Sequence, residues 1–189
     1  MGRVSQAQAE ENRRRVVDTA SRLFREQGTH VSVADLMKAA GLTHGAFYKQ
    51  FASKEALVDE ATTHAFDELA RRHAAGLERY DGRRDAAQRA LIDAYLSIEH
   101  RDDAADGCPV AALAADVARG GEDREARRVY TEGVADFAAF LASDGGEGAD
   151  GIARLCTLFG ALLLSRATTG SPLSEEILAA AHAALTKAH

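Results

Sequence analysis

Hydrophobic residues recur every three or four positions through most of the chain, the spacing that places them on one face of an α-helix. Glycines and helix-capping residues interrupt this pattern and divide it into separate helices. No alternating pattern of the kind found in β-strands extends beyond a few residues. The sequence therefore predicts an all-α protein with helices over residues 7–27, 32–40, 43–50, 54–79, 85–100, 109–119, 124–142, 152–168 and 174–187.

The first three predicted helices include two short ones that are separated by a tight turn. Ser32 and Thr43 stand where these two helices begin, and such side chains accept hydrogen bonds from free backbone N–H groups. Gly41 stands at the turn, where glycine readily adopts the left-handed backbone conformation that the turn needs. Two short helices joined in this way are typical of a helix-turn-helix, whose second helix enters the major groove of DNA.

The later helices are separated by loops of a different kind. Residues 144–151 contain four glycines, and we expect them to be the most flexible internal segment. Cys108 precedes a proline and is predicted to cap the helix over 109–119, whereas Ser174 is predicted to cap the last helix.

Charge is distributed unevenly along the 189 residues, although a composition of 46% hydrophobic and 28% charged residues is ordinary for a globular protein. Residues 1–55 carry nine Lys or Arg and six Asp or Glu, whereas the rest of the chain carries 14 basic and 23 acidic residues. A basic segment attached to an acidic body indicates that the segment contacts a polyanion such as nucleic acid.

Two cysteines in a chain of this length do not form a disulfide framework and favour a reducing compartment. The N-terminus lacks a signal-peptide pattern, and no apolar run approaches the length needed to cross a bilayer. We therefore expect a cytoplasmic protein that has no membrane partner.

Residues 33–57 read VADLMKAAGLTHGAFYKQFASKEAL, and this run resembles the DNA-binding domain of the TetR family of transcriptional regulators. With the upstream Ala20, Phe24 and Gly28, the similarity covers residues 13–58. It implies an N-terminal three-helix DNA-binding domain with a helix-turn-helix over residues 1–53. It also implies a C-terminal helical bundle over residues 54–189 that binds an effector and dimerises.

The resemblance also implies roles for individual residues at the DNA. Thr43 corresponds to a position that caps the recognition helix and bonds a phosphate, and His44 and Gly45 fall where base edges are approached. Tyr48 and Lys54 correspond to phosphate-binding positions, although the flanking phenylalanines leave open that Tyr48 is a core aromatic. The predicted DNA-binding set is Ser32, Thr43, His44, Gly45, Phe47, Tyr48, Lys49 and Lys54.

Candidate catalytic or metal-binding motifs are absent from the sequence. The histidines show neither a His-Glu-x-x-His pattern nor paired Cys and His spacing, and no nucleophile-elbow or phosphate-loop motif is present. We expect neither enzymatic activity nor a bound metal or cofactor.

The body contains apolar residues on the inward faces of its central helices, most of which we interpret as core. Because the family places its effector among these helices, we predict a small-molecule effector site with polar edges that orient the ligand. The candidate residues are Phe66, Tyr95, His100, Cys108, Tyr130 and Phe137.

Cys108 leaves two interpretations open. At a helix N-cap, the helix dipole and free N–H groups stabilise a thiolate that can react with electrophiles or oxidants. The alternative is an inert, half-buried cap. Cys156 lies in an apolar stretch and is expected to be part of the core.

The last two helices carry more apolar surface than one subunit can cover. Gly160, Ala161 and Ala180 would permit two helices to approach closely. Pairing of two subunits into a four-helix interface buries this surface and agrees with the resemblance. The predicted interface residues are Leu155, Phe159, Leu162, Leu163, Ile177 and Ala181.

Together these features predict a homodimeric repressor that a small-molecule effector releases from a palindromic double-stranded DNA operator. Two alternatives keep the same fold: a transcriptional activator, and a regulator that senses electrophiles through Cys108. A third alternative is a helical small-molecule-binding protein without DNA function.

Overall fold

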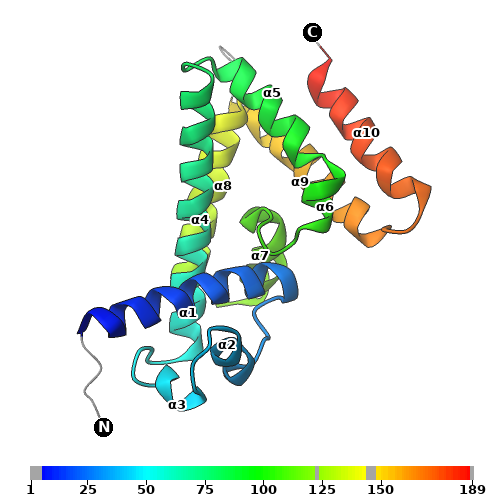
Figure 1. The fold of residues 1–189 in the computed structure, drawn as a ribbon. Coiled ribbons are helices and arrows are strands. Elements are labelled where there is room, and N and C mark those ends of the chain that lie inside the picture. Colours follow the sequence, from blue (N-terminus) through cyan, green and yellow to red (C-terminus); the bar gives the residue numbers. More distant parts are fainter. Residues whose placement is uncertain (1–5, 122–123, 144–147, 188–189) are drawn as a thin grey trace.

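The computed structural model describes residues 6–121, 124–143 and 148–187, and every regular element in these ranges is a helix (Figure 1). In chain order the helices are α1 (Gln6–Gln27), α2 (Val33–Ala39), α3 (His44–Phe47), α4 (Lys54–Arg79), α5 (Arg84–Tyr95), α6 (Ile98–Asp102), α7 (Pro109–Arg119), α8 (Glu125–Leu141), α9 (Gly148–Ala167) and α10 (Pro172–Thr186).

Helices α1 to α3 form a head at one end of the molecule, and α4 runs from this head to the far end of the body (Figure 1). Helix α8 packs along α4, α9 packs on α8, and α10 packs on α9. Helix α7 lies between the head and the body and contacts both α1 and α8. The long α4 therefore links the two parts of the molecule directly.

Two hydrophobic cores hold this arrangement together. The core of the head is formed mainly by α1 to α3, but it also includes Leu57 and Ala61 of α4 and Leu113 of α7. Packing of the head thus continues beyond residue 53, where the predicted boundary lies. The second core joins α4, α5, α7, α8, α9 and α10 within the body.

The predicted helix-turn-helix is present, with a shorter second helix than the pattern indicated. The Ser32 hydroxyl accepts a hydrogen bond from the backbone N–H of Asp35 at 3.1 Å and thereby starts α2. Gly41 has a φ of +69°, which allows the chain to turn sharply before α3. Helix α3 ends at Phe47, whereas helical spacing predicted that it would continue to residue 50.

The segment predicted as one helix over 85–100 is two helices. Helix α5 ends at Tyr95, and Ser97 starts α6 by accepting a hydrogen bond from the His100 N–H at 3.1 Å. Apolar spacing continues across this break, and the capping serine was the available signal for it.

The starts of the last two helices also differ from prediction. Residues 144–147 of the predicted flexible segment lie outside the described residues, and α9 already begins at Gly148. Helix α10 is capped by Ser171, not Ser174. The Ser174 hydroxyl is buried and donates a hydrogen bond to the Ser165 carbonyl oxygen at 2.7 Å, which fastens α10 to α9.

No helix in the described part of the chain combines the length and the apolar composition needed to cross a membrane.

Candidate DNA-binding face and effector cavity

The recognition helix α3 presents several predicted DNA-binding residues to solvent. Thr43, His44, Gly45 and Lys49 are all exposed, and the Tyr48 side chain is 65% exposed. The rings of His44 and Tyr48 lie edge to face, with centroids 5.6 Å apart. This exposure removes the interpretation of Tyr48 as a core aromatic and leaves its hydroxyl accessible to a phosphate.

The structure corrects the assignment of Phe47 to the DNA contacts. Its side chain is completely buried and stacks on Phe51 with a centroid distance of 5.4 Å. A side chain in this position cannot reach DNA without unfolding the head. Phe47 instead anchors α3 to the core, so that the residues around it face outward.

Ser32 and Thr43 use their hydroxyl groups differently. The Ser32 hydroxyl caps α2 and also donates a hydrogen bond to the Asp35 carboxylate at 2.6 Å. The Thr43 side chain makes no capping hydrogen bond to α3, although the residue stands at the N-cap. Of these two hydroxyl groups, that of Thr43 is therefore the better placed to bond a phosphate.

Gly45 is unusual because nothing in the protein requires its lack of a side chain. A Cβ atom built at this position would have no heavy atom within 4 Å, and the backbone there does not require glycine. Close approach of another molecule to the backbone of α3 explains a glycine here better than internal packing does.

Arg13 is a structural residue of the head that the sequence pattern did not identify. It donates hydrogen bonds to the Gln50 carbonyl oxygen and to the Glu60 carboxylate. Its guanidinium also lies 4.4 Å from the centroid of the Phe51 ring. These contacts fix the chain that follows α3 against α1 and α4.

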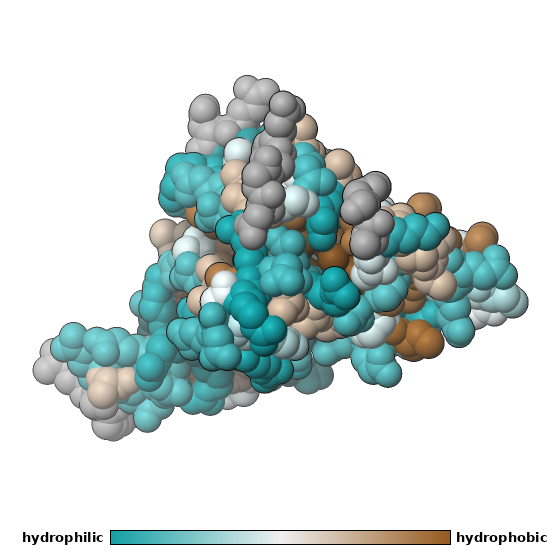
Figure 2. Space-filling view, turned by 90° about the horizontal axis from the view of Figure 1, so that it is seen from above, coloured by the Kyte–Doolittle hydropathy of each residue, from teal (hydrophilic) through white to brown (hydrophobic). Residues whose placement is uncertain are grey.

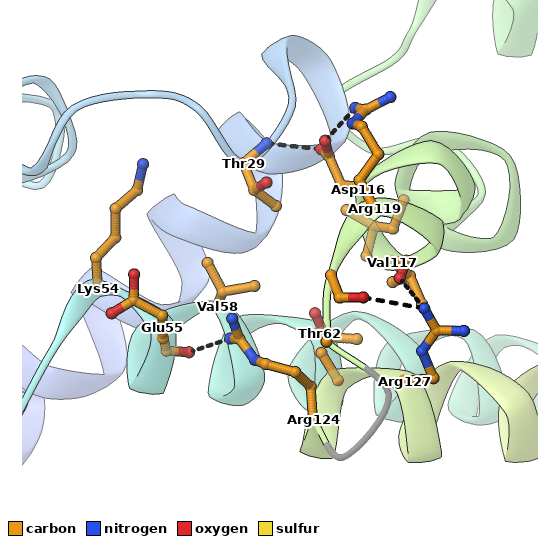
Figure 3. Close-up of a pocket in the computed structure, with 14 residues that line it drawn as sticks. Thr29, Lys54, Glu55, Val58, Thr62, Asp116, Val117, Arg119, Arg124 and Arg127 are labelled. Carbon is orange, nitrogen blue, oxygen red and sulfur yellow. Dashed lines mark hydrogen bonds and ion pairs between the residues drawn. The ribbon is translucent and has the colours of Figure 1, made fainter.

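A pocket of about 280 Å³ separates the head from α7 and α8, with Lys54 at one side of it (Figure 3). Asp116 accepts a hydrogen bond from the Thr29 backbone N–H at 2.8 Å across this junction. Arg124 donates hydrogen bonds to the Glu55 carbonyl oxygen and to the Asp59 carboxylate, both at 3.0 Å. Polar contacts therefore hold the start of α4 and the end of α1 against the body.

Arg25 makes the most deeply buried of these head-to-body contacts, with a side chain that is only 1% exposed. Its guanidinium lies 3.2 Å from the Glu68 carboxylate and 3.4 Å from the Gly107 carbonyl oxygen. Burial lowers the pKa of Arg25, and the adjacent Glu68 carboxylate opposes this shift. The pair connects α1 of the head to α4 and to the loop before α7.

Asp18, His64 and Glu68 form a polar cluster between α1 and α4. One ligand-type atom from each lies within 4.8 Å of the others, and His64 Nε2 lies 3.6 Å from Asp18 Oδ1 and 4.0 Å from Glu68 Oε1. Sequence spacing did not reveal this cluster because Asp18 comes from a different helix. Because Glu68 also pairs with Arg25, the cluster extends the polar contacts between α1 and α4.

A cavity of about 400 Å³ lies in the body between α4, α5 and α8. Four of the six predicted effector residues line it, namely Tyr95, His100, Cys108 and Phe137. Phe66 and Tyr130 do not line this cavity, so the structure does not bring them together with the other four. Tyr130 packs edge to face on Phe66 and donates its hydroxyl hydrogen to the Val110 carbonyl oxygen at 2.8 Å.

Three polar groups in the cavity are held uncharged by burial. Burial lowers the pKa of His73 to about 4 and lowers that of His100, so both rings are neutral at pH 7. Burial also raises the pKa of the Tyr95 hydroxyl well above its usual value. His100 Nδ1 lies 2.7 Å from the Tyr95 carbonyl oxygen and must carry the proton, which leaves His100 Nε2 as an acceptor.

Cys108 occupies the predicted N-cap of α7, but its environment does not favour a thiolate. The residue is buried, and burial raises the pKa of its thiol despite the nearby N–H groups of Val110 and Ala111. This supports the interpretation as an inert cap that lines the cavity. Cys156, expected in the core, is exposed on α9, because its helical position faces away from α8.

The neutral state of His73 predicts a loss of stability in mild acid. The unfolded chain binds a proton at His73 near pH 6.5, whereas the folded protein does so only near pH 4. Stability therefore falls as the pH decreases through this window, by about 2 kcal/mol at pH 5 from this residue. Thermal unfolding at pH 7 and pH 5 should show a smaller fall for His73→Phe than for the wild type. Equal falls in both proteins would refute this assignment.

The predicted dimer interface requires a correction within α9. Leu155 and Leu162 are buried in the body core against neighbouring helices, so they cannot also contact a second subunit. Phe159, Ile177 and Ala181 are partly buried, and Leu163 is 38% exposed. Two of the predicted interface residues thus lie on the inward face of α9, and pairing through α9 and α10 stays a prediction.

The outward faces of α9 and α10 remain apolar in the single chain. In Figure 2, hydrophobic residues gather on the side of the molecule where α9 and α10 lie in Figure 1. The large exposed hydrophobic residues of these helices are Ile152, Leu163, Leu164 and Leu173.

Comparison with known proteins gives the same assignment for the head. Residues 16–61 match the family model described as bacterial regulatory proteins, tetR family. The HTH-type transcriptional regulator AcrR from Shigella flexneri is 41% identical over 61 residues, which is 32% of this chain. The match spans only 28% of AcrR, so it concerns the head and not the whole protein.

Solved structures of similar fold extend the comparison over the body. The reduced form of NemR from E. coli has a TM-score of 0.75 and 22% identity, covering 93% of this chain and 95% of that one. A TetR family regulator from Agrobacterium tumefaciens has a TM-score of 0.73 and 21% identity, with coverages of 95% and 100%. At these identities the body is similar in fold alone. The head therefore matches the DNA-binding domain of the tetR family of bacterial regulatory proteins, and the chain shares the fold of TetR family regulators of known structure.

Proposed function

We propose that this protein is a homodimeric repressor that binds a palindromic operator and is released from it by a small-molecule effector. The observation that carries the proposal is the connection of two sites by one helix. Helix α4 starts beside the recognition helix and lines the effector cavity near its other end. A ligand that changes the position of α4 would therefore also change the position of the head.

Operator binding is supported by the exposed polar face of α3 and by the basic charge of the head. Base contacts are assigned to His44 and to the backbone at Gly45, because both lie in the first turn of α3. Phosphate contacts are assigned to Thr43 and Tyr48, which flank α3, and to Lys54 at the start of α4. Lys49 is exposed beside them and adds positive charge.

Substitutions in the head should separate phosphate contacts from base contacts. Tyr48→Phe and Lys54→Ala should each weaken binding to all DNA sequences by about 3–10-fold, and Lys54→Ala should reduce the salt slope by about one. His44→Ala should change the base preferred at one position in each half-site. Fluorescence anisotropy at several salt concentrations measures the first effect, and selection from a degenerate half-site measures the second. An unchanged preference in His44→Ala would contradict the assigned register of α3.

Coupling between cavity and head is assigned to the loop that precedes α7. Cys108 lines the cavity, and the adjacent Gly107 accepts a hydrogen bond from Arg25 of the head. Arg72, at the cavity, also donates a hydrogen bond to the Asp106 carbonyl oxygen of this loop at 2.8 Å. An effector that displaces the loop would alter the contacts of α1 as well as those of α4.

Loss of the buried Arg25–Glu68 ion pair should lower the free energy of unfolding more than loss of a surface ion pair. Glu68→Gln leaves the Arg25 guanidinium buried without its nearest carboxylate, and we expect a loss of about 2–3 kcal/mol of stability. Glu132→Gln removes an exposed partner of Arg128 on α8 and should have little effect on stability, because solvent screens this ion pair. Urea unfolding of the two variants gives the comparison. Equal losses would mean that the Arg25–Glu68 pair does not hold the head to the body.

The position of the two heads gives the proposed switch. A dimer can engage two half-sites only when its recognition helices are separated by about 34–36 Å or a multiple of this distance. An effector that binds better to a form with another spacing lowers operator affinity by its difference in affinity for the two forms. Electrophoretic mobility shift of the upstream DNA of its own gene tests operator binding directly. Absence of any specific shift would favour the alternative of a helical binding protein without DNA function.

A further inference from the structure

The effector cavity contains two polar atoms that are buried without a hydrogen-bond partner. These are the Tyr95 hydroxyl oxygen and His73 Nε2. Tyr95 is only 6% exposed, and its hydroxyl lies near the Cys108 thiol, which is a weak hydrogen-bonding group. Buried polar groups in folded proteins are almost always paired, so these two atoms indicate where a bound molecule places polar groups of its own.

One wall of the cavity is aromatic. The His73 ring stacks on Phe140 with a centroid distance of 4.5 Å and an interplanar angle of 12°, and Phe137 lies 4.6 Å from the same ring. Leu69 and Leu91 also line the cavity. Such a wall favours a planar, largely apolar ligand over a flexible polar one.

The charged side chains around the cavity are all basic. Arg72 and Arg79 line it from α4, and both residues are exposed. Among the described residues that line the cavity there is no Asp or Glu, although the chain as a whole has a net charge of −6. Positive charge at the exposed rim and neutral polar groups at the buried end divide the cavity into two chemically different parts.

We propose, on the basis of the function proposed above, that the effector is a planar aromatic acid whose hydroxyl group lies at the end remote from its carboxylate. The ring lies beside His73 and Phe140, and the hydroxyl group bonds to Tyr95. The carboxylate lies at the rim, near Arg72 and Arg79. A cavity of about 400 Å³ is large enough for one such molecule.

Isothermal titration calorimetry of the full-length protein with three matched probes tests this assignment. The probes are 6-hydroxy-2-naphthoate, 2-naphthoate without the hydroxyl, and the uncharged 6-hydroxy-2-naphthamide. We expect 6-hydroxy-2-naphthoate to bind most tightly and each of the other two to bind about tenfold more weakly. Equal affinities for the three probes, or no binding of any of them at millimolar concentration, would overturn the proposal.

Variants assign each preference to its residue. Tyr95→Phe should remove the advantage of the hydroxyl group, and Arg79→Gln should reduce the advantage of the carboxylate over the amide several-fold. Arg71→Gln is the matched control, because Arg71 is exposed on the same helix and does not line the cavity. If Arg71→Gln reduced the advantage of the carboxylate as much as Arg79→Gln, general electrostatic attraction would replace the proposed site.

A separate measurement of operator binding by mobility shift distinguishes failure of the proposed ligand class from failure of the proposed function. A protein that binds the hydroxynaphthoate but no specific DNA would refute the proposed function and retain the ligand class. A protein that binds specific DNA but none of the three probes would refute the ligand class and retain operator binding.

Discussion

Leu163→Arg should dissociate the dimer and abolish tight operator binding. Leu163 is 38% exposed on the outward face of α9, so the single chain can accommodate arginine there. Within the proposed four-helix interface the same charge would be buried without a partner, at a cost of about 3–5 kcal/mol. The dimer dissociation constant should therefore rise by at least about a hundredfold.

Sedimentation measures dissociation of the dimer, and fluorescence anisotropy with operator DNA measures the loss of DNA binding. Thr131→Arg adds the same charge on the exposed side of α8 and should leave both measurements unchanged. Leu162→Arg should instead unfold the body, because Leu162 is completely buried within one chain. A dimeric Leu163→Arg protein that binds operator normally would exclude this face as the interface.

Gly151→Ala should strongly destabilise the protein although it adds only one methyl group. A Cβ atom at Gly151 would lie 2.1 Å from the Ala138 carbonyl oxygen, far inside van der Waals contact. Because the obstructing atom belongs to the backbone of α8, it cannot rotate away, and α8 and α9 must separate. We expect a net loss of about 2–3 kcal/mol, after allowance for the higher helix propensity of alanine.

Gly76→Ala provides the matched control for this effect. Gly76 also lies within a helix, but a Cβ atom there would have no heavy atom within 4 Å. The substitution should therefore raise stability by up to about 1 kcal/mol through helix propensity alone. Thermal unfolding of both variants compares the two cases. If Gly151→Ala were as stable as Gly76→Ala, the close packing of α8 on α9 would be wrong.

Prediction from sequence succeeded where a local signal determined the structure. Ser32 and Gly41 predicted the start of α2 and the turn after it, and the resemblance over residues 13–58 agrees with the match of residues 16–61 to the tetR family model. The range predicted for the helix that starts at Lys54 agrees with α4 at both ends. Such features depend on hydrogen bonds and backbone conformations within a few residues, so a single sequence contains the necessary information.

Prediction failed where the outcome depended on contacts between distant segments. Helical periodicity identified the apolar positions of α9, but it could not tell that Leu155 and Leu162 are buried in the body core while Leu163 is exposed. The sequence also could not tell which of two neighbouring aromatic side chains is buried. Phe47 is buried, and Tyr48 is exposed. Arg25 and Glu68 are 43 residues apart, and nothing in their spacing indicated a buried pair.

The cavity combines residues that the sequence singled out with one that it did not. Tyr95, His100, Cys108 and Phe137 were predicted near the effector and line the cavity. His73 was passed over because no metal-binding pattern surrounds it, although burial and the stacking of Phe140 give it a distinct chemical environment. This environment is formed by side chains of α4 and α8, which lie far apart in the sequence, and no local motif indicates it.

Selection of bound sequences from a random DNA pool by the purified full-length protein tests the central claim most directly. For a homodimeric operator-binding protein we predict enrichment of two inverted half-sites. Their centres should be separated by about 34–36 Å of duplex or a multiple of this distance. The enrichment should disappear when the selection is repeated with Leu163→Arg, which retains the head but not the proposed pairing. Enrichment of no sequence, or of a single half-site that Leu163→Arg selects equally well, would contradict the account.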